Sequence, residues 1–129
     1  MNNKVGIVII SHSIKIGEGV KELAEQVINK VPIEVAAGTE DNEIGTSIEK
    51  IQVAIEKVNR GAGALLLYDL GSAKMNAEMA IEFGNYTDVK IGDGIPLVEG
   101  SYIAAVESNM GHSLEEILVS LEKIKLENM

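Results

Sequence analysis

A single histidine follows an aliphatic run near the start of the chain. Residues 5–10 read VGIVII, and Ser11, His12 and Ser13 come directly after them. A neutral imidazole nitrogen is a good nucleophile toward phosphorus, and the phosphoramidate that it forms is still an activated phosphoryl donor. A lone histidine after a strand is also typical of an ordinary loop residue. His12 by itself therefore leaves both interpretations open.

Asp69 is the carboxylate best placed to serve this histidine, because it follows a second aliphatic run as His12 follows the first. A carboxylate on one ring nitrogen would fix the tautomer and support the positive charge that develops during transfer. Ser13, Ser72 and Thr39, with backbone N–H groups at helix N-termini, are available as donors to phosphoryl oxygens. Asp69 and Ser72 are equally typical of helix N-caps.

Several other kinds of site are not indicated. The chain lacks G-x-G-x-x-G, G-x-x-x-x-G-K-[ST] and G-x-S-x-G patterns, which would indicate dinucleotide, nucleoside triphosphate and serine-hydrolase sites. Its two histidines and scattered carboxylates show no metal-ligand spacing, so we expect neither a metal nor a cofactor. The second histidine, His112, precedes a capping serine, and we interpret it as a surface residue without a chemical role.

The composition is that of one globular domain spanning residues 1–129, with 46% hydrophobic residues and no cysteine. The net charge of −9 disfavours nucleic acid and anionic membrane surfaces and favours a partner with a basic docking face, although solubility alone explains it equally well. No apolar run reaches membrane-spanning length and no signal peptide is evident, which predicts a soluble, cytoplasmic protein.

Hydrophobic periodicity predicts alternating strands and helices. Strands are expected at residues 5–10, 33–36, 62–68 and 89–91, and helices at 17–29, 48–58, 73–83 and 97–109. A last helix follows Ser113, which forms a capping box with Glu116. The buried face of the first helix is expected to comprise Val20, Leu23, Ala24, Val27 and Ile28.

Such alternation predicts an α/β fold in which a parallel sheet carries helices on both faces. Functional groups of these folds gather at the carboxyl ends of the strands. Polar or glycine-rich segments follow each expected strand, at residues 11–13, 37–39, 69–72 and 92–94. If the first and third strands are neighbours, His12 and Asp69 lie side by side.

Five segments, in order, resemble motifs of one family. Residues 8–13 (VIISHS) with 17–20 (GEGV), 36–39 (AAGT), 44–47 (IGTS) and 68–76 (YDLGSAKMN) are similar to motifs of the phosphocarrier M subunits of dihydroxyacetone kinases that depend on the phosphotransferase system. The resemblance implies the fold of mannose-type enzyme IIA, a three-layer α/β/α sandwich whose four-stranded parallel sheet has the order 2-1-3-4, usually as a homodimer.

The resemblance also implies a function. His12 would accept a phosphoryl group from phospho-HPr, with Nε2 as the acceptor by analogy, and pass it to ADP on the kinase L subunit; the chain itself would bind no nucleotide. Asp69 is the second expected catalytic residue. The residues expected around the phosphoryl group are Ser13, Gly38, Thr39 and Ser72.

One departure concerns Thr39, which stands where the family commonly has a second glycine. Either the loop differs there or the hydroxyl serves as a donor. Two alternative functions stay open. A sugar-transport enzyme IIA of the mannose class shares the fold and the histidine, although that class tends to read DLxGGxP where this chain reads DLGSA. A regulatory module that senses phosphorylation would also keep His12 and Asp69.

Overall fold

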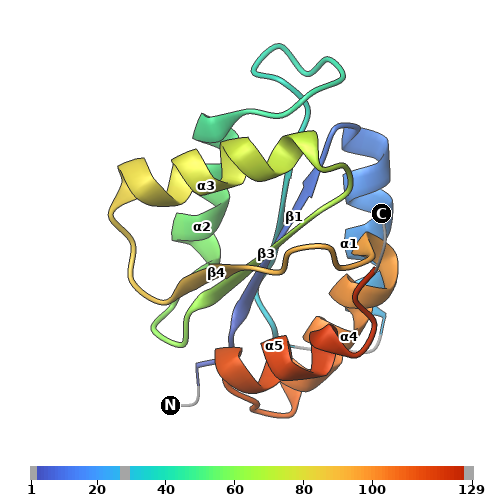
Figure 1. Cartoon of the computed structure of the whole chain (residues 1–129), viewed down its shortest axis with the longest axis vertical. Coiled ribbons are helices and arrows are strands. Elements are labelled where there is room, and N and C mark those ends of the chain that lie inside the picture. Colours follow the sequence, from blue (N-terminus) through green and yellow to red (C-terminus); the bar gives the residue numbers. More distant parts are fainter. Residues whose placement is uncertain (1–2, 27–29, 127–129) are drawn as a thin grey trace.

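The computed structural model describes residues 3–26 and 30–126, which form a parallel sheet between two layers of helices (Figure 1). The strands are β1 (Gly6–Ser11), β2 (Ile33–Ala37), β3 (Ala64–Tyr68) and β4 (Val89–Ile91). They are arranged in the order β2-β1-β3-β4, and all neighbours are parallel. The expected α/β sandwich with sheet order 2-1-3-4 is therefore confirmed.

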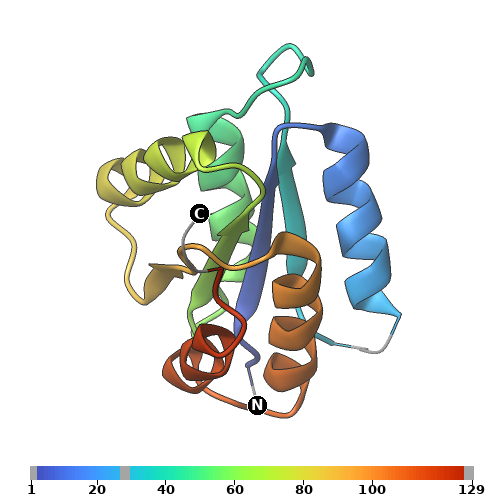
Figure 2. The same ribbon diagram turned by 45° about the vertical axis from the view of Figure 1, so that its right-hand side comes forward.

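The described residues form five helices, which cover the two faces of the sheet. They are α1 (Ile14–Glu25), α2 (Ile48–Val58), α3 (Ser72–Gly84), α4 (Leu97–Asn109) and α5 (Leu114–Glu122). Helices α1, α4 and α5 pack on one face, and α2 and α3 pack on the other, so that each face has its own hydrophobic cluster (Figure 2). Strands β1 and β3 are buried along their whole length, as their continuous aliphatic sequences predict.

Helix α1 begins earlier than its sequence suggests. It starts at Ile14 rather than residue 17, because the Ser13 hydroxyl accepts the N–H of Ile16 at 3.3 Å and caps the helix. Leu23, expected to be buried, is 53% exposed, since the buried stripe consists of Gly17, Val20 and Ala24. The expected Val27 and Ile28 lie outside the described residues.

Strand β3 begins two residues later than predicted. Gly63 has a φ of +97°, which ends the extended conformation, and a Cβ there would lie 2.7 Å from the carbonyl oxygen of Asp88. Helix α1 ends at Glu25, and its predicted end at residue 29 lies outside the described residues; the other predicted boundaries agree within a residue or two. The predicted capping box of α5 is also confirmed, with Ser113 Oγ accepting the N–H of Glu116 and the Glu116 carboxylate accepting the N–H of Ser113.

The carboxyl ends of β1, β2 and β3 meet at one rim of the sheet, and the loop of residues 38–47 projects beyond it between β2 and α2 (Figures 1 and 2). None of the helices formed by the described residues has the length and apolar character needed to cross a bilayer.

Candidate functional site

His12 and Asp69 are neighbours at this rim. His12 follows β1 and Asp69 follows β3; the strands pair with Ile10 opposite Tyr68, and the N–H of Asp69 donates to the carbonyl of Ile10. The Nδ1 atom of His12 lies 3.0 Å from Oδ1 of Asp69. Both side chains are largely buried, with 18% and 16% of their surface exposed. The expected adjacency of the two loops is thus observed.

Asp69 is held as an ionised acceptor by several donors. Its Oδ2 accepts the Ser11 hydroxyl at 2.8 Å and the backbone N–H of His12 at 3.0 Å, and its Oδ1 also accepts the N–H of Leu70 at 2.7 Å. Burial by itself raises the pKa of Asp69, but the hydrogen bonds from His12, Ser11 and Leu70 outweigh it, so the pKa lies below its ordinary value of 3.8.

This carboxylate determines the tautomer of the neutral His12 ring. An ionised carboxylate only accepts hydrogen bonds, so Nδ1 must carry the proton and Nε2 keeps its lone pair. The Ser72 hydroxyl lies 2.9 Å from Nε2 and donates to it. The arrangement therefore presents one imidazole nitrogen as a nucleophile, next to the first residue of α3.

Asp69 and Ser72 do not cap helix α3. Its N-cap is Gly71, which has no side chain to offer, and Ser72 is already the first helical residue. The N-cap interpretation of these two residues is therefore wrong. The start of α3 instead brings an uncapped helix N-terminus next to His12 Nε2, and the partial positive charge of such a terminus favours anions.

The remaining expected site residues are not in hydrogen-bonding contact with the His12 ring in the described part of the chain. The Ser13 hydroxyl caps α1. Gly38 has a φ of +78° and donates its N–H to the carbonyl of Ser11 at 3.2 Å. The Thr39 hydroxyl accepts the N–H of Glu43 in a turn, and Thr39 is not among the residues with positive φ. Threonine at this position therefore needs no glycine-like backbone.

Hydrogen bonds hold the loop of residues 38–47 beside His12. The N–H of Gly45 donates to the His12 carbonyl at 2.9 Å, and the Asn76 amide of α3 donates to the Thr46 hydroxyl at 2.7 Å. A Cβ on Gly45 would lie 2.6 Å from the Thr39 methyl group, so these two residues also pack together. The loop that carries Gly38 and Thr39 thus forms one wall of the site.

Sequence reasoning missed Ser11. This serine is fully buried, and its hydroxyl donates to Asp69 Oδ2 while accepting the N–H of Ser13 at 3.1 Å. The only signal was a polar residue at the end of an otherwise aliphatic strand. His112, expected at the surface, is half-buried and its Nδ1 lies 3.2 Å from Glu107 Oε1. Among the described residues, no group of three or more His, Cys, Asp or Glu could hold a metal ion.

Comparison with known families gives this site a context. Residues 6–118 match the family model of the PTS system fructose IIA component, also called EIIA-man. The chain belongs to this family. The match spans His12, Asp69 and Ser72, the three side chains that meet at the rim of the sheet.

The curated relatives of this family member include dihydroxyacetone kinase subunits. A PTS-dependent dihydroxyacetone kinase, phosphotransferase subunit DhaM, from Lactococcus lactis is 38% identical over 95% of this chain and 97% of that protein. A PEP-dependent dihydroxyacetone kinase phosphoryl donor subunit from Listeria innocua is 36% identical, covering 98% and 99%. The corresponding Escherichia coli subunit is 38% identical over 88% of this chain, which spans 25% of that longer protein.

Solved structures share the fold. A protein described as being of unknown function has a TM-score of 0.83 and 28% identity, covering 98% of both chains. The dihydroxyacetone kinase from C. freundii, in complex with AMP-PNP and Mg²⁺, has a TM-score of 0.65 and 20% identity; this chain covers 25% of it, and at that identity the likeness concerns the fold alone.

Proposed function

We propose that this chain is the phosphoryl donor subunit of a dihydroxyacetone kinase, with His12 as its phosphorylated residue. One observation carries the proposal: Asp69 accepts from Nδ1 of His12, which leaves Nε2 as the nucleophile at the open rim of the sheet. The relatives named as phosphoryl donor subunits, 36–38% identical over nearly their whole length, support the same role.

In the first step, the lone pair of His12 Nε2 attacks the phosphorus of the phosphohistidine on HPr. A nitrogen–phosphorus bond forms on His12 as the bond on HPr breaks, and the histidine of HPr leaves with its electron pair. The His12 ring becomes positively charged, and the adjacent Asp69 carboxylate stabilises that charge. The proton stays on Nδ1 throughout, so no separate base is needed.

In the second step, a terminal phosphate oxygen of ADP attacks the phosphorus on His12. The nitrogen–phosphorus bond breaks and returns its electron pair to Nε2, which restores the neutral ring and yields ATP. We assign the ADP to the kinase L subunit, because this sequence lacks the common nucleotide-binding patterns. The regenerated ATP then phosphorylates dihydroxyacetone on another subunit, away from this chain.

The transferring phosphoryl group needs donors for its oxygens. Ser72 lies against Nε2, so its hydroxyl must turn aside and is then placed to donate to an oxygen. Backbone N–H groups at the start of α3 stand beside it, where the helix dipole favours negative charge. Ser13, Gly38 and Thr39 form the surrounding wall of the proposed site.

The proposed partners, HPr and the kinase subunits, imply a cytoplasmic location.

The decisive test of this role is a coupled reaction. Phosphoenolpyruvate, enzyme I, HPr, ADP and the two other kinase subunits are mixed with this chain, and the formation of dihydroxyacetone phosphate is measured. We expect product with the wild type and none with His12→Ala. His112→Ala is the matched control and should retain full activity, because His112 lies between α4 and α5, where its ring contacts Glu107, away from the rim that carries His12.

Two outcomes would contradict the proposed function and favour one of the two alternatives. If the chain accepts phosphate from HPr but cannot support dihydroxyacetone phosphorylation, it is a sensor of phosphorylation rather than a kinase subunit. If it passes phosphate to a membrane sugar permease instead, it is a sugar-transport enzyme IIA.

A further inference from the structure

Helix α3 is apolar on two sides. Its buried side consists of small residues, Ala73, Ala77 and Ala80, which belong to the hydrophobic cluster on that face of the sheet. Its outer side carries large ones: Met75 is 67% exposed and Phe83 is 64% exposed. The outer side of a surface helix is normally polar. The described part of the chain leaves these side chains uncovered, so this side of α3 has the character of a contact surface for a partner.

The exposed apolar residues form a stripe that begins at the phosphoryl site. Intervals of three or four residues, which place side chains on one side of a helix, separate Ser72, Met75, Met79 and Phe83. Ser72 is the residue whose hydroxyl lies 2.9 Å from His12 Nε2. From there the helix extends by about 16 Å to its last apolar residue, pointing away from the rim (Figure 1). Residues 75, 79 and 83 form what we call the α3 stripe.

Charge is distributed unevenly around the rim. The tip of the loop of residues 38–47 exposes Glu40, Asp41 and Glu43. The first turn of α3 reads SAKM and so carries no acidic side chain, and its uncapped N-terminus adds partial positive charge next to His12. A partner that brings an anionic group to His12 is therefore repelled by the loop tip and favoured at the start of α3.

Two carboxylates flank the α3 stripe farther along the helix. Glu78 and Glu82 are both exposed, and they lie four residues apart, so they form a second row beside the stripe. A complementary partner surface would have an apolar centre with basic residues along one flank. The same carboxylates disfavour insertion of the stripe into an anionic membrane surface.

The proposed function requires a partner of this kind. In the second step, ADP, which carries several negative charges, must reach His12 on the surface of another subunit. We propose that the α3 stripe is the docking surface for the subunit that holds ADP, through an apolar patch flanked by basic residues on that subunit. This inference rests on the proposed function, and it separates the two partners of His12: HPr approaches over the acidic loop, and the ADP-holding subunit approaches over α3.

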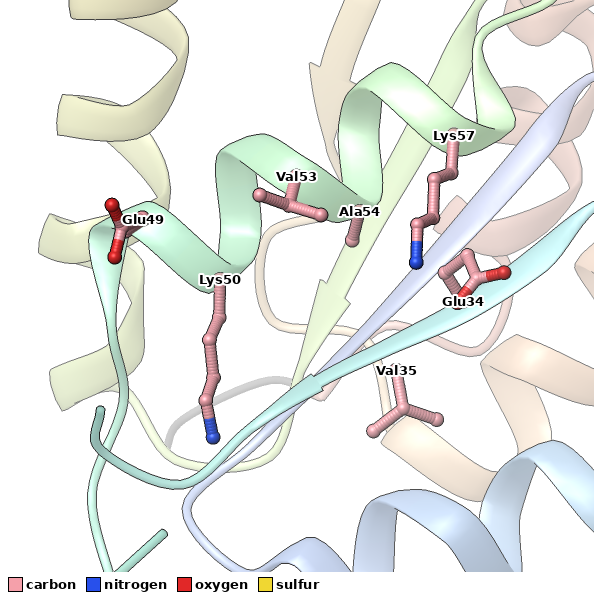
Figure 3. Close-up of a pocket in the computed structure, with 7 residues that line it drawn as sticks. All are labelled: Glu34, Val35, Glu49, Lys50, Val53, Ala54 and Lys57. Carbon is pink, nitrogen blue, oxygen red and sulfur yellow. The ribbon is translucent and has the colours of Figure 1, made fainter. Parts of the chain in front are cut away.

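The groove between β2 and α2 is the main alternative surface (Figure 3). Its volume is about 230 Å³, and its apolar lining is limited to Val35, Val53 and Ala54. Lys50, which also lines the groove, donates to Asn42 in the loop of residues 38–47 at 2.7 Å. A partner in this groove would therefore approach His12 past the acidic loop, which disfavours ADP.

Single-turnover transfer to ADP tests the proposal. The chain is phosphorylated through HPr, mixed with the ADP-loaded subunit, and the ATP formed is measured by rapid quench. At a limiting concentration of that subunit, Met75→Gln combined with Phe83→Gln should slow ATP formation by about tenfold, because two exposed apolar contacts are lost. At a saturating concentration the rate should recover, since the variant weakens docking and leaves the chemistry intact.

Two controls accompany this variant. Phosphorylation of the same double variant by HPr should proceed at nearly the wild-type rate. Val53→Gln, which changes an apolar residue that is 45% exposed on α2, should alter neither step.

The carboxylate row gives an independent test. Glu78→Gln combined with Glu82→Gln removes both negative charges beside the α3 stripe. It should slow ATP formation at low ionic strength and match the wild type at high ionic strength, because salt screens the contact with basic residues. An unchanged rate at low ionic strength would contradict the charge complementarity that the proposal requires.

The outcomes separate this inference from the proposed function. If the wild type forms no ATP, the proposed function fails and the inference fails with it. If the wild type forms ATP and the variant of the α3 stripe forms it equally fast, or if only Val53→Gln slows it, the proposed function stands and the inference is overturned. Equal slowing of the HPr step in the stripe variant would show that both partners share this surface, which also overturns the inference.

Discussion

At the scale of single residues, the role of His12 depends on how firmly Asp69 is held. Four donors converge on this carboxylate, two of them from the backbone, so it has little freedom to rotate or to accept a proton. In the proposed mechanism Ser11, which is buried and donates to Asp69 Oδ2, is a positioning residue that acts through Asp69. The sequence was sufficient to pair His12 with Asp69, but the Ser11 contact depends on a side-chain rotamer that no pattern encodes.

Asp69→Asn should slow phosphoryl transfer from HPr by roughly a hundredfold while leaving the fold intact. An amide presents a donor as well as an acceptor, so it no longer forces the proton onto Nδ1. Rapid-quench measurement of the transfer rate checks this expectation. Asp93→Asn is the matched control: Asp93 accepts from Tyr68 and Lys74 rather than from His12, and this variant should transfer at nearly the wild-type rate.

The Asp69 carboxylate should make the free energy of unfolding depend on pH in the acid range. The pKa of Asp69 in the folded protein lies below 3.8, so the unfolded chain binds its proton more readily. Its contribution to stability is therefore complete above about pH 4 and is lost as the pH falls through the folded value. Urea unfolding between about pH 3 and pH 7 should show a shallower acid decline in Asp69→Asn than in the wild type. Equal slopes would contradict this assignment.

At the scale of elements, the two glycines of α1 show where the sequence-based prediction of the helix differs from the structure. The apolar pattern predicted a first helix that starts at residue 17, but the helix starts at Ile14 and includes both Gly17 and Gly19, which have low helix propensity. Gly17 is needed because the helix lies so close to β2 that a Cβ would come within 2.6 Å of the Val35 side chain. That approach is a tertiary contact, and hydrophobic periodicity cannot reveal it. The local signal that the prediction missed was Ser13, whose N-cap position indicates that the helix starts at the next residue.

The two glycines of α1 should respond oppositely to alanine. Gly17→Ala should destabilise the protein by about 1–3 kcal/mol, because Val35 or the helix must move to admit the methyl group. Gly19→Ala should stabilise it by up to about 1 kcal/mol, since no atom lies within 4 Å of that Cβ and alanine favours the helix. Urea unfolding measures both. Equal effects at the two positions would show that α1 does not pack on β2 as described.

At the scale of the whole molecule, the fold predicted from the sequence agrees with the structure better than at the smaller scales. Buried aliphatic runs separated by amphipathic helices predicted the α/β class, and the family resemblance supplied the strand order, which local patterns do not determine.

The distribution of charge is also a property of the whole molecule. The chain carries a net charge of −9, and the loop beside His12 exposes Glu40, Asp41 and Glu43. This distribution favours approach of a partner through a basic face.

The rate of phosphoryl transfer from HPr should consequently fall as salt is added, by about tenfold between low and high ionic strength. Glu40→Gln combined with Asp41→Asn should reduce the low-salt rate and flatten the dependence. Stopped-flow kinetics over a salt series provides the measurement. A rate that rises with salt would mean that the docking faces repel each other.

The central claim is that His12 carries the phosphoryl group on Nε2. The most direct measurement is labelling with radioactive phosphoenolpyruvate through enzyme I and HPr, followed by NMR of the phosphorylated imidazole. We predict one acid-labile phosphoryl group per chain on Nε2 of His12, and none in His12→Ala. Acid-labile phosphate on the His12→Ala variant, or a group bonded to Nδ1, would contradict the mechanism that the Asp69 contact implies.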